Sequence, residues 1–238
     1  MNIKKIYEDE YIFVLSKPSG LTVNRSKTEK NETLQDILEE AELAPRMAKE
    51  YGPIPSKEES DFVERLGIVH RLDKDTSGLI ITAKDLESFK ILQEQFKNHE
   101  IKKEYICLVF GEVKDELFEV NAPIKRSLNN RLKFAVVKEG KNAKTTFERL
   151  NTIANLTFLK ALPHTGRTHQ IRVHLLALGN PIVGDKTYSS AFQLKKALDL
   201  GYKRLMLHAL KLGFYHPKTK VFIELEDTLP DDFKGCII

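Results

Sequence analysis

The segment HRLDKDTSGL, from His70 to Leu79, holds more reactive groups than a simple turn requires. It carries three basic side chains, two carboxylates and two hydroxyls between the apolar runs LGIV and LIITA. Asp, Thr and Ser side chains bond nearby backbone amides, and Gly accepts unusual φ angles. We therefore expect residues 75–78 to build the bend.

This assignment leaves Asp73 for chemistry, with the apolar Leu72 beside it to anchor the loop. A solvated aspartate is ionised at neutral pH, so Asp73 can serve as a nucleophile or a base. The residues alone leave a second interpretation open, in which Asp73 and Asp75 both serve the turn. His70 and Thr76 are expected to support the loop.

A second group of reactive residues is PHTGRTHQIRVH, from Pro163 to His174. We expect Thr165-Gly166 to open a helix, whose N-terminal amides and positive dipole end would suit a phosphate or a carboxylate. Arg172 would project from the same side. An arginine that faces a catalytic carboxylate holds it ionised and oriented.

Three histidines in this segment raise the question of a metal site. His164, His169 and His174 are five residues apart, so successive side chains are about 140° further round a helix and do not converge. We expect no zinc site. Arg167 and His169 are instead expected to contact backbone or phosphate groups.

Positive charge is concentrated although the net charge is only +4. One band contains seven cations and the single acid Glu139, namely Lys125, Arg126, Arg131, Lys133, Lys138, Lys141 and Lys144. Such a band can form a phosphate-binding face. The alternative is that KRSLNNRLK is a solvated hairpin, which charge alone favours.

The remaining composition is typical of a folded soluble chain. At 238 residues it can bury a sizeable core, and its two cysteines form no CxxC motif, so a disulfide scaffold or a cysteine-rich zinc module is not expected. The N-terminus has no signal-peptide core, and the run YIFVL is too short to span a bilayer. These features indicate a cytoplasmic protein.

Strand patterns dominate and βαβ alternation is absent. The predicted elements are a strand pair in 4–20, helices in 31–43, 85–100 and 165–179, an exposed excursion over 44–60, a strand in 104–113, a hairpin in 145–162 that turns at Ala154-Asn155, and a hairpin in 204–227 that turns at 216–218. Asp85 and either Asn31 or Thr33 are predicted helix caps, and Gly179 a helix end. This pattern favours a mixed, largely antiparallel α+β fold over a doubly wound sheet.

Several blocks together resemble one known family. HRLDKDTSGL, PHTGRTHQIRVHLLALGNPIVGDKTY and RLMLHALKLGFYHP resemble the RluA family of RNA pseudouridine synthases, and YEDEYIFVLSKPSGLTVN and KKEYICLVFGEV match in order. The resemblance spans nearly the whole chain. It implies isomerisation of uridine in structured RNA to its C-glycoside, with no cofactor and no metal. It also implies a mainly antiparallel sheet with a central catalytic cleft flanked by helices and loops.

The resemblance assigns roles to single residues. It places the catalytic aspartate at Asp73, the tyrosine that stacks on the target base at Tyr105, and the basic partner of the aspartate at Arg172. It further suggests that Arg71 fills the gap left when the uridine is flipped out. The aspartate could attack the base or the sugar, or abstract a sugar proton, and the family pattern leaves these routes open.

The partner implied is ribosomal RNA or a transfer-RNA stem-loop, bound by a monomer without membrane contact. The residues expected to contact RNA besides Arg71 are Arg167, His169, Lys125, Arg126, Arg131 and Lys133. We expect residues 1–238 to form a single catalytic domain without an N-terminal S4 domain, because the chain begins almost at the YEDEYIFVL block. RNA affinity would then come from the catalytic domain itself.

Two competing hypotheses remain. A non-catalytic RNA-binding protein on the same fold would be expected to lack Asp73, which is present. A metal-dependent phosphodiesterase that uses Asp73, Asp75 and the histidines would lose activity to a chelator.

Overall fold

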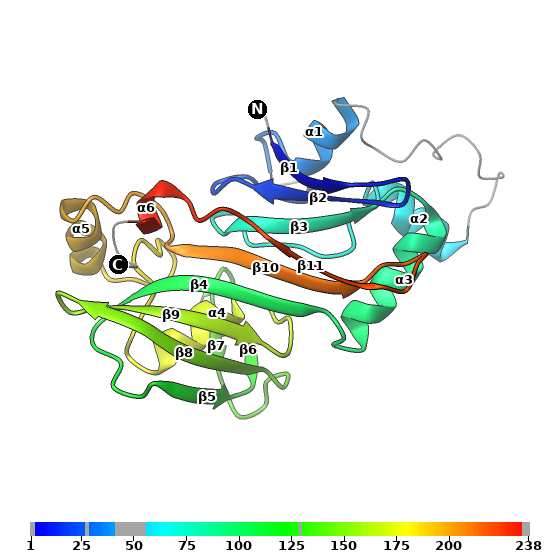
Figure 1. Ribbon diagram of the computed structural model, residues 1–238. Coiled ribbons are helices and arrows are strands. Elements are labelled where there is room, and N and C mark those ends of the chain that lie inside the picture. Colours follow the sequence, from blue (N-terminus) through cyan, green and yellow to red (C-terminus); the bar gives the residue numbers. More distant parts are fainter. Residues whose placement is uncertain (1–2, 27–28, 41–55, 129, 235–238) are drawn as a thin grey trace. The chain divides into compact units, whose positions relative to one another are not determined.

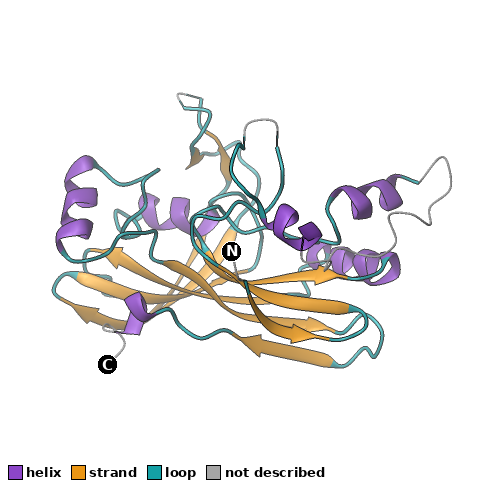
Figure 2. Ribbon diagram, turned by 90° about the horizontal axis from the view of Figure 1, so that it is seen from above, coloured by secondary structure: helices purple, strands orange, loops and turns teal. Residues whose placement is uncertain are grey.

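The computed structural model describes residues 3–26, 29–40, 56–128 and 130–234 (Figure 1). The chain divides into two compact units. Unit 1 comprises residues up to 102 together with 211–227, and unit 2 comprises 103–210 together with the segment from 228 onward. Strand β10 (Leu207–Tyr215) contributes residues to each unit. Strands and loops account for most of the described chain (Figure 2).

Unit 1 is built on antiparallel strands. Its elements are β1 (Lys4–Glu8), β2 (Ile12–Lys17), α1 (Leu34–Glu40), α2 (Lys57–Glu64), β3 (Ser77–Ala83), α3 (Leu86–Lys97) and β11 (Phe222–Glu226). Strand β2 pairs with β1 on one side and with β3 on the other, and β11 pairs with residues 211–215 of β10. Both β2 and β3 are buried along most of their length, which explains their continuous apolar sequences.

Local sequence signals set the helix starts in unit 1. Thr33 caps α1, since its hydroxyl oxygen accepts from the amide of Asp36, and Asp85 caps α3 by accepting from the amide of Ser88 at 2.8 Å. Both predictions are confirmed. The predicted excursion over 44–60 is wrong at its end, because Ser56 opens α2 with a capping box. The rest of that segment, up to residue 55, lies outside the described residues.

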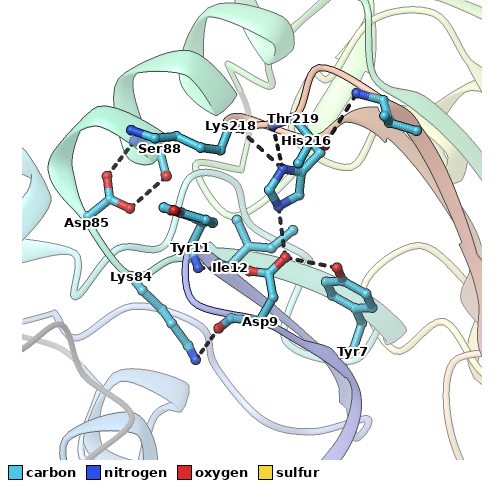
Figure 3. A network of polar contacts seen from close by, with 11 residues as sticks. Tyr7, Asp9, Tyr11, Ile12, Lys84, Asp85, Ser88, His216, Lys218 and Thr219 are labelled. Carbon is cyan, nitrogen blue, oxygen red and sulfur yellow. Dashed lines mark hydrogen bonds and ion pairs between the residues drawn. The ribbon is translucent and has the colours of Figure 1, made fainter.

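A polar cluster joins two distant turns of unit 1 (Figure 3). Asp9 follows β1 and accepts from the hydroxyl of Tyr7 at 2.8 Å and from the amide of Ile12 at 2.9 Å. His216 follows β10, is 3% exposed, and contacts the same carboxylate through Nε2 at 2.8 Å. Its Nδ1 accepts from the amide of Thr219 at 3.1 Å, so Nε2 is the nitrogen that donates to Asp9. The cluster therefore ties the β10–β11 hairpin to the start of the chain.

Unit 2 is a second antiparallel assembly with its own core. Its elements are β4 (Lys102–Phe110), β5 (Leu117–Asn121), β6 (Ile124–Arg126), β7 (Phe134–Val136), β8 (Lys144–Ile153), β9 (Leu156–Pro163), α4 (Gln170–Ala177), α5 (Ala191–Asp199) and α6 (Asp231–Lys234). The strand order β4-β9-β8-β5 is antiparallel throughout, and β6 pairs with β7 as a separate hairpin. Phe147, Phe158 and Leu175 of α4 are buried members of one hydrophobic core.

The structure confirms the predicted fold class, a mixed α+β fold with mainly antiparallel strands. The β8–β9 hairpin turns at Ala154-Asn155, as predicted, and both residues have positive φ angles, which the two-residue hairpin turn requires. The described part of the KRSLNNRLK segment begins on β6 and ends directly before β7, with which β6 pairs as a hairpin. Within the part of the chain that the structure describes, no helix is long and apolar enough to cross a bilayer.

Candidate functional site

Asp73 stands at the first position of a tight turn in unit 1. The amide of Thr76 donates to the carbonyl of Asp73 at 3.1 Å, which closes the turn over residues 73–76. The prediction that residues 75–78 build the bend is therefore correct for residues 75 and 76 and wrong for residues 77 and 78. Ser77 and Gly78 already belong to β3, where Gly78 pairs with Lys17. These two residues therefore belong to the β2–β3 pairing, and the bend lies closer to Asp73 than predicted. Asp73 is half-buried.

A buried lysine holds the other side of this turn. Lys17 is 0% exposed, and its ammonium donates to the carbonyls of Pro18 at 2.9 Å, Leu21 at 2.8 Å and Lys74 at 2.9 Å. The amide of Gly20 donates to the same Lys74 carbonyl at 2.9 Å. The sequence pattern indicated only that a strand ends at Lys17. The sequence feature that could have indicated this role is a single cation between an apolar run and a proline.

Further side chains brace the loop. His70 accepts from the amide of Ile81 at 3.0 Å and stacks on Phe96 with ring centroids 4.6 Å apart, which confirms its supporting role. Lys74 forms an ion pair with Glu29 at 3.1 Å. Hydrogen bonds from the Thr22 hydroxyl and the Asn31 amide, together with Lys74, lower the pKa of Glu29 to about 2. Glu29 therefore stays ionised under all ordinary conditions and keeps its partners.

Arg71 and Leu72 are neighbours in the same loop but differ in solvent exposure. Leu72 is 4% exposed and anchors the loop, as predicted, whereas Arg71 is exposed to solvent. An exposed arginine directly before the Asp73 turn can reach a bound polyanion without breaking the loop.

In unit 2, Arg172 is fixed by an ion pair that the sequence analysis missed. Arg172 lies on α4, is 5% exposed, and donates from Nε and Nη2 to the two carboxylate oxygens of Asp185, at 2.8 Å each. This two-point geometry fixes the plane of the guanidinium group. Gly184 has φ 75°, and a Cβ at that position would lie 1.9 Å from the carbonyl oxygen of Arg204. The GDKTY motif therefore needs its glycine so that Asp185 can reach Arg172.

Tyr188 connects Arg172 to two more residues. The guanidinium of Arg172 lies 5.0 Å from the Tyr188 ring centroid. The Tyr188 hydroxyl accepts from the amide of Phe134 at 2.9 Å and lies 2.8 Å from Nδ1 of His169. His169 has a left-handed backbone, with φ 56°, which costs energy in a residue other than glycine and is often found at functional sites. Tyr188 thus links β7 to the start of α4.

The predicted helix start was five residues too early. α4 begins at Gln170, and residues 165–168 form an irregular loop, so Thr165-Gly166 does not present a helix N-terminus. The buried Gln170 explains this difference. Its Oε1 accepts from the Thr165 hydroxyl at 2.6 Å and the Arg167 amide at 3.0 Å, which folds the loop back onto the helix.

The three histidines have separate partners. His164 Nε2 lies 2.8 Å from the Thr146 hydroxyl, while His169 contacts Tyr188 as described above. The ring of His174 bonds both the Thr145 hydroxyl and the Ala122 carbonyl, at 3.0 Å each, and burial lowers its pKa. Among the described residues there is no group of three or more His, Cys, Asp or Glu side chains that could hold a metal ion.

Tyr105 lies on β4, opposite Ala161 of β9, and is half-buried. Two residues before it, the ammonium of Lys103 donates to the carbonyl of Thr165 at 3.3 Å. Burial lowers the pKa of Lys103 to about 8. The β4 segment KKEY therefore contacts the same 165–168 loop that precedes α4.

The predicted RNA-contact residues of unit 2 cluster near the β6–β7 hairpin. Arg126 and Lys133 lie 5.0 Å and 5.9 Å from the ring centroids of Phe134 and Tyr188, respectively. Arg131 is exposed on the hairpin loop, and its carbonyl accepts from the Arg126 guanidinium. Lys125 is exposed on β6. Asp73 and Arg71 belong to unit 1, whereas the other predicted site residues belong to unit 2.

Known proteins resemble this chain over most of its length. A family model described as RNA pseudouridylate synthase matches residues 11–177. An "Uncharacterized RNA pseudouridine synthase" of Aquifex aeolicus is 39% identical over 237 residues, covering 98% of this chain and 71% of the relative. A "Ribosomal large subunit pseudouridine synthase D" of Nitrosomonas europaea is 36% identical, covering 99% of this chain and 64% of the relative.

A solved structure shows the same fold. "Human RNA Pseudouridylate Synthase Domain Containing 4" superposes with a TM-score of 0.69 at 25% identity, covering 97% of this chain and 90% of that one. The chain spans about two thirds of the length of the two bacterial relatives named above. The resemblance inferred from the motifs is thus confirmed, and the chain belongs to the RNA pseudouridylate synthase family.

Proposed function

We propose that this pseudouridine synthase uses Asp73 as its catalytic carboxylate and acts on uridines of large-subunit ribosomal RNA. The structure of the Asp73 turn is the observation that supports Asp73 as the catalytic carboxylate. The backbone around Asp73 is fixed by the Thr76 amide and by the buried Lys17, while the Asp73 side chain stays half-buried. Asp75 lies at the corner of the turn, where its carbonyl accepts from Ser19 at 2.7 Å.

The chemistry requires a carboxylate but no net oxidation. The N1–C1′ bond of uridine breaks, the uracil rotates, C5 bonds to C1′, the C5 proton leaves to water, and N1 takes up a proton in its place. Asp73 can attack the base or the sugar, or remove a sugar proton, and each route returns it to its starting state. We propose that both units contribute to one catalytic domain that needs neither a metal nor a cofactor.

Tyr105 and Arg172 are the proposed partners of the reaction. Tyr105 would stack on the flipped uracil, since base–aromatic stacking offsets the cost of removing the base from its helix. Arg172 would keep the reacting carboxylate ionised. Its guanidinium is already oriented by Asp185, so little conformational entropy is lost when substrate binds.

The proposed contacts to RNA are mainly cationic. Arg71 would fill the space left by the flipped uridine, and its exposure next to the Asp73 loop supports that role. The proposed backbone contacts are Lys125, Arg126, Arg131, Lys133, Arg167 and His169. Phosphate contacts of this kind position an RNA without reading its sequence.

The choice of ribosomal RNA rests on the printed names of relatives such as the one from Nitrosomonas europaea. A ribosomal substrate would place the enzyme in the cytoplasm. We further propose that the enzyme is a monomer. To test this proposal, unmodified transcripts of large-subunit ribosomal RNA and of transfer RNA are incubated with the protein. Pseudouridine is then mapped by carbodiimide adducts that stop reverse transcriptase. New stops in the ribosomal transcript are expected. Stops confined to transfer RNA would contradict the substrate, and stops in neither would contradict the activity.

A further inference from the structure

A groove of about 480 Å³ is lined by residues of unit 2. Its walls come from the β6–β7 hairpin, from Glu139 and Lys141, and from the loop 166–168. The loop ends directly before His169, whose ring meets the edge of Phe134 at a centroid distance of 5.6 Å. Phe134 thus lines the groove and also contacts His169 and Tyr188.

The charge of the groove is strongly positive. Four cations line it, namely Lys125, Arg126, Lys141 and Arg167, against the single acid Glu139. Among the described residues none of these cations forms an ion pair with a carboxylate. Arg167 instead donates from Nε to the carbonyl of Asn142 at 3.0 Å, which holds the arginine over the groove. Such a set of cations attracts a phosphate group.

The groove also contains a flat stacking surface. Phe134 pairs directly with Arg126 across the hairpin, and the guanidinium lies 5.0 Å from the ring centroid. The amide of Phe134 donates to Tyr188, and its ring lies at an interplanar angle of 70° to that of His169. Aromatic rings and arginine planes are the surfaces on which unpaired RNA bases stack.

Glu139 gives the groove a chemical preference. A carboxylate only accepts hydrogen bonds. Adenine, cytosine and guanine each present an amino group on the Watson–Crick edge, whereas uracil presents one N–H between two carbonyl oxygens. A carboxylate beside a stacked base therefore favours the amino-bearing bases.

We propose that this groove binds one unpaired nucleotide of the RNA substrate. Its base stacks on the surface formed by Phe134 and Arg126, its phosphate is held by Lys141 and Arg167, and Glu139 selects an amino-bearing base over uracil. The inference rests on the proposed RNA substrate and adds a position of base selectivity separate from the uridine that reacts.

The test uses fluorescein-labelled hexamers of cytidine, adenosine and uridine, titrated with the full chain and followed by fluorescence anisotropy. Wild type should bind the cytidine and adenosine hexamers at least fivefold more tightly than the uridine hexamer. Glu139→Gln should abolish most of that preference. Phe134→Ala should weaken all three hexamers about tenfold, as expected for the loss of one stacked base, and Phe134→Tyr should restore binding. Glu112→Gln, at an exposed position outside the groove, is the matched charge control and should keep the wild-type preference.

The outcomes separate this inference from the proposed function. Equal affinity of wild type for the three hexamers, or a preference that survives Glu139→Gln, would overturn the base selectivity. Unchanged binding by a folded Phe134→Ala protein would overturn the stacking site. In steady-state turnover of ribosomal transcript, Phe134→Ala should raise KM more than it lowers kcat. A wild-type protein without turnover would instead count against the proposed function, whatever the hexamers show.

Discussion

Lys103 is a lysine whose burial should make the free energy of unfolding depend on pH. Burial against the 165–168 loop lowers the pKa of this lysine from 10.5 to about 8. Between these values the unfolded chain holds the proton and the folded chain does not, so the stability of the folded state rises with pH. Below about pH 8 the buried charge costs stability in full. The difference between the two pKa values corresponds to about 3 kcal/mol, of which about 2 kcal/mol falls between pH 7 and pH 9.5.

The measurement compares wild type with Lys103→Met by urea denaturation at several pH values from 7 to 9.5. Taking the difference between the two proteins removes the titration of all other groups. The wild type should gain about 2 kcal/mol relative to the variant over this range. Lys102→Met, at the exposed neighbouring position, controls for the loss of a lysine. A difference for Lys103→Met that stays constant with pH would refute the argument that burial governs this group.

Three further predictions concern buried polar contacts. Lys17→Met removes the ammonium that donates to three backbone carbonyls, of which the Lys74 carbonyl keeps the Gly20 amide, and should lower the free energy of unfolding by about 2 kcal/mol in urea titrations; an unchanged value would show that the lysine does not hold the Asp73 loop. Asp185→Asn leaves the Arg172 charge buried without its counter-ion and should cost about 3–5 kcal/mol by the same measurement, whereas a loss below about 1 kcal/mol would contradict the ion pair's role. Burial lowers the pKa of His174 in the folded chain. As the pH falls below the pKa that this histidine has in the unfolded chain, the unfolded chain takes up a proton before the folded chain does. Wild type should therefore lose stability relative to His174→Gln as the pH falls from 7 to 5, and parallel pH profiles would contradict this.

Local sequence signals predicted the elements well. The capping side chain of Asp85, the turn at Ala154-Asn155 and the helix end at Gly179 all act within a few residues of where they lie, so the pattern alone contains them. The start of α4 was predicted wrongly because it depends on contacts of the Gln170 side chain, including one with a distant strand. Gln170 draws the preceding loop back through its amide group, which also donates to the carbonyl of Lys144 on β8.

The contacts that orient the site depend on partners far apart in the chain. Lys17 reaches the carbonyl of Lys74, 57 positions away, and Tyr188 reaches the amide of Phe134, 54 positions away. A sequence shows that a lysine precedes a proline or that a tyrosine follows GDKT, but not which buried backbone group each will meet. The turn at Asp73 was misplaced by the same limit, because the pairing of Gly78 with Lys17 decides where β3 begins.

Release of tritium from RNA labelled at C5 of uracil tests the central claim most directly, because isomerisation must expel that hydrogen. Wild type should release tritium from ribosomal transcript at a rate that EDTA does not change. Asp73→Asn should release none above background, while Asp75→Asn, which alters the corner of the same turn, should retain activity. Release by Asp73→Asn at the wild-type rate would contradict the assignment of Asp73 as the catalytic carboxylate.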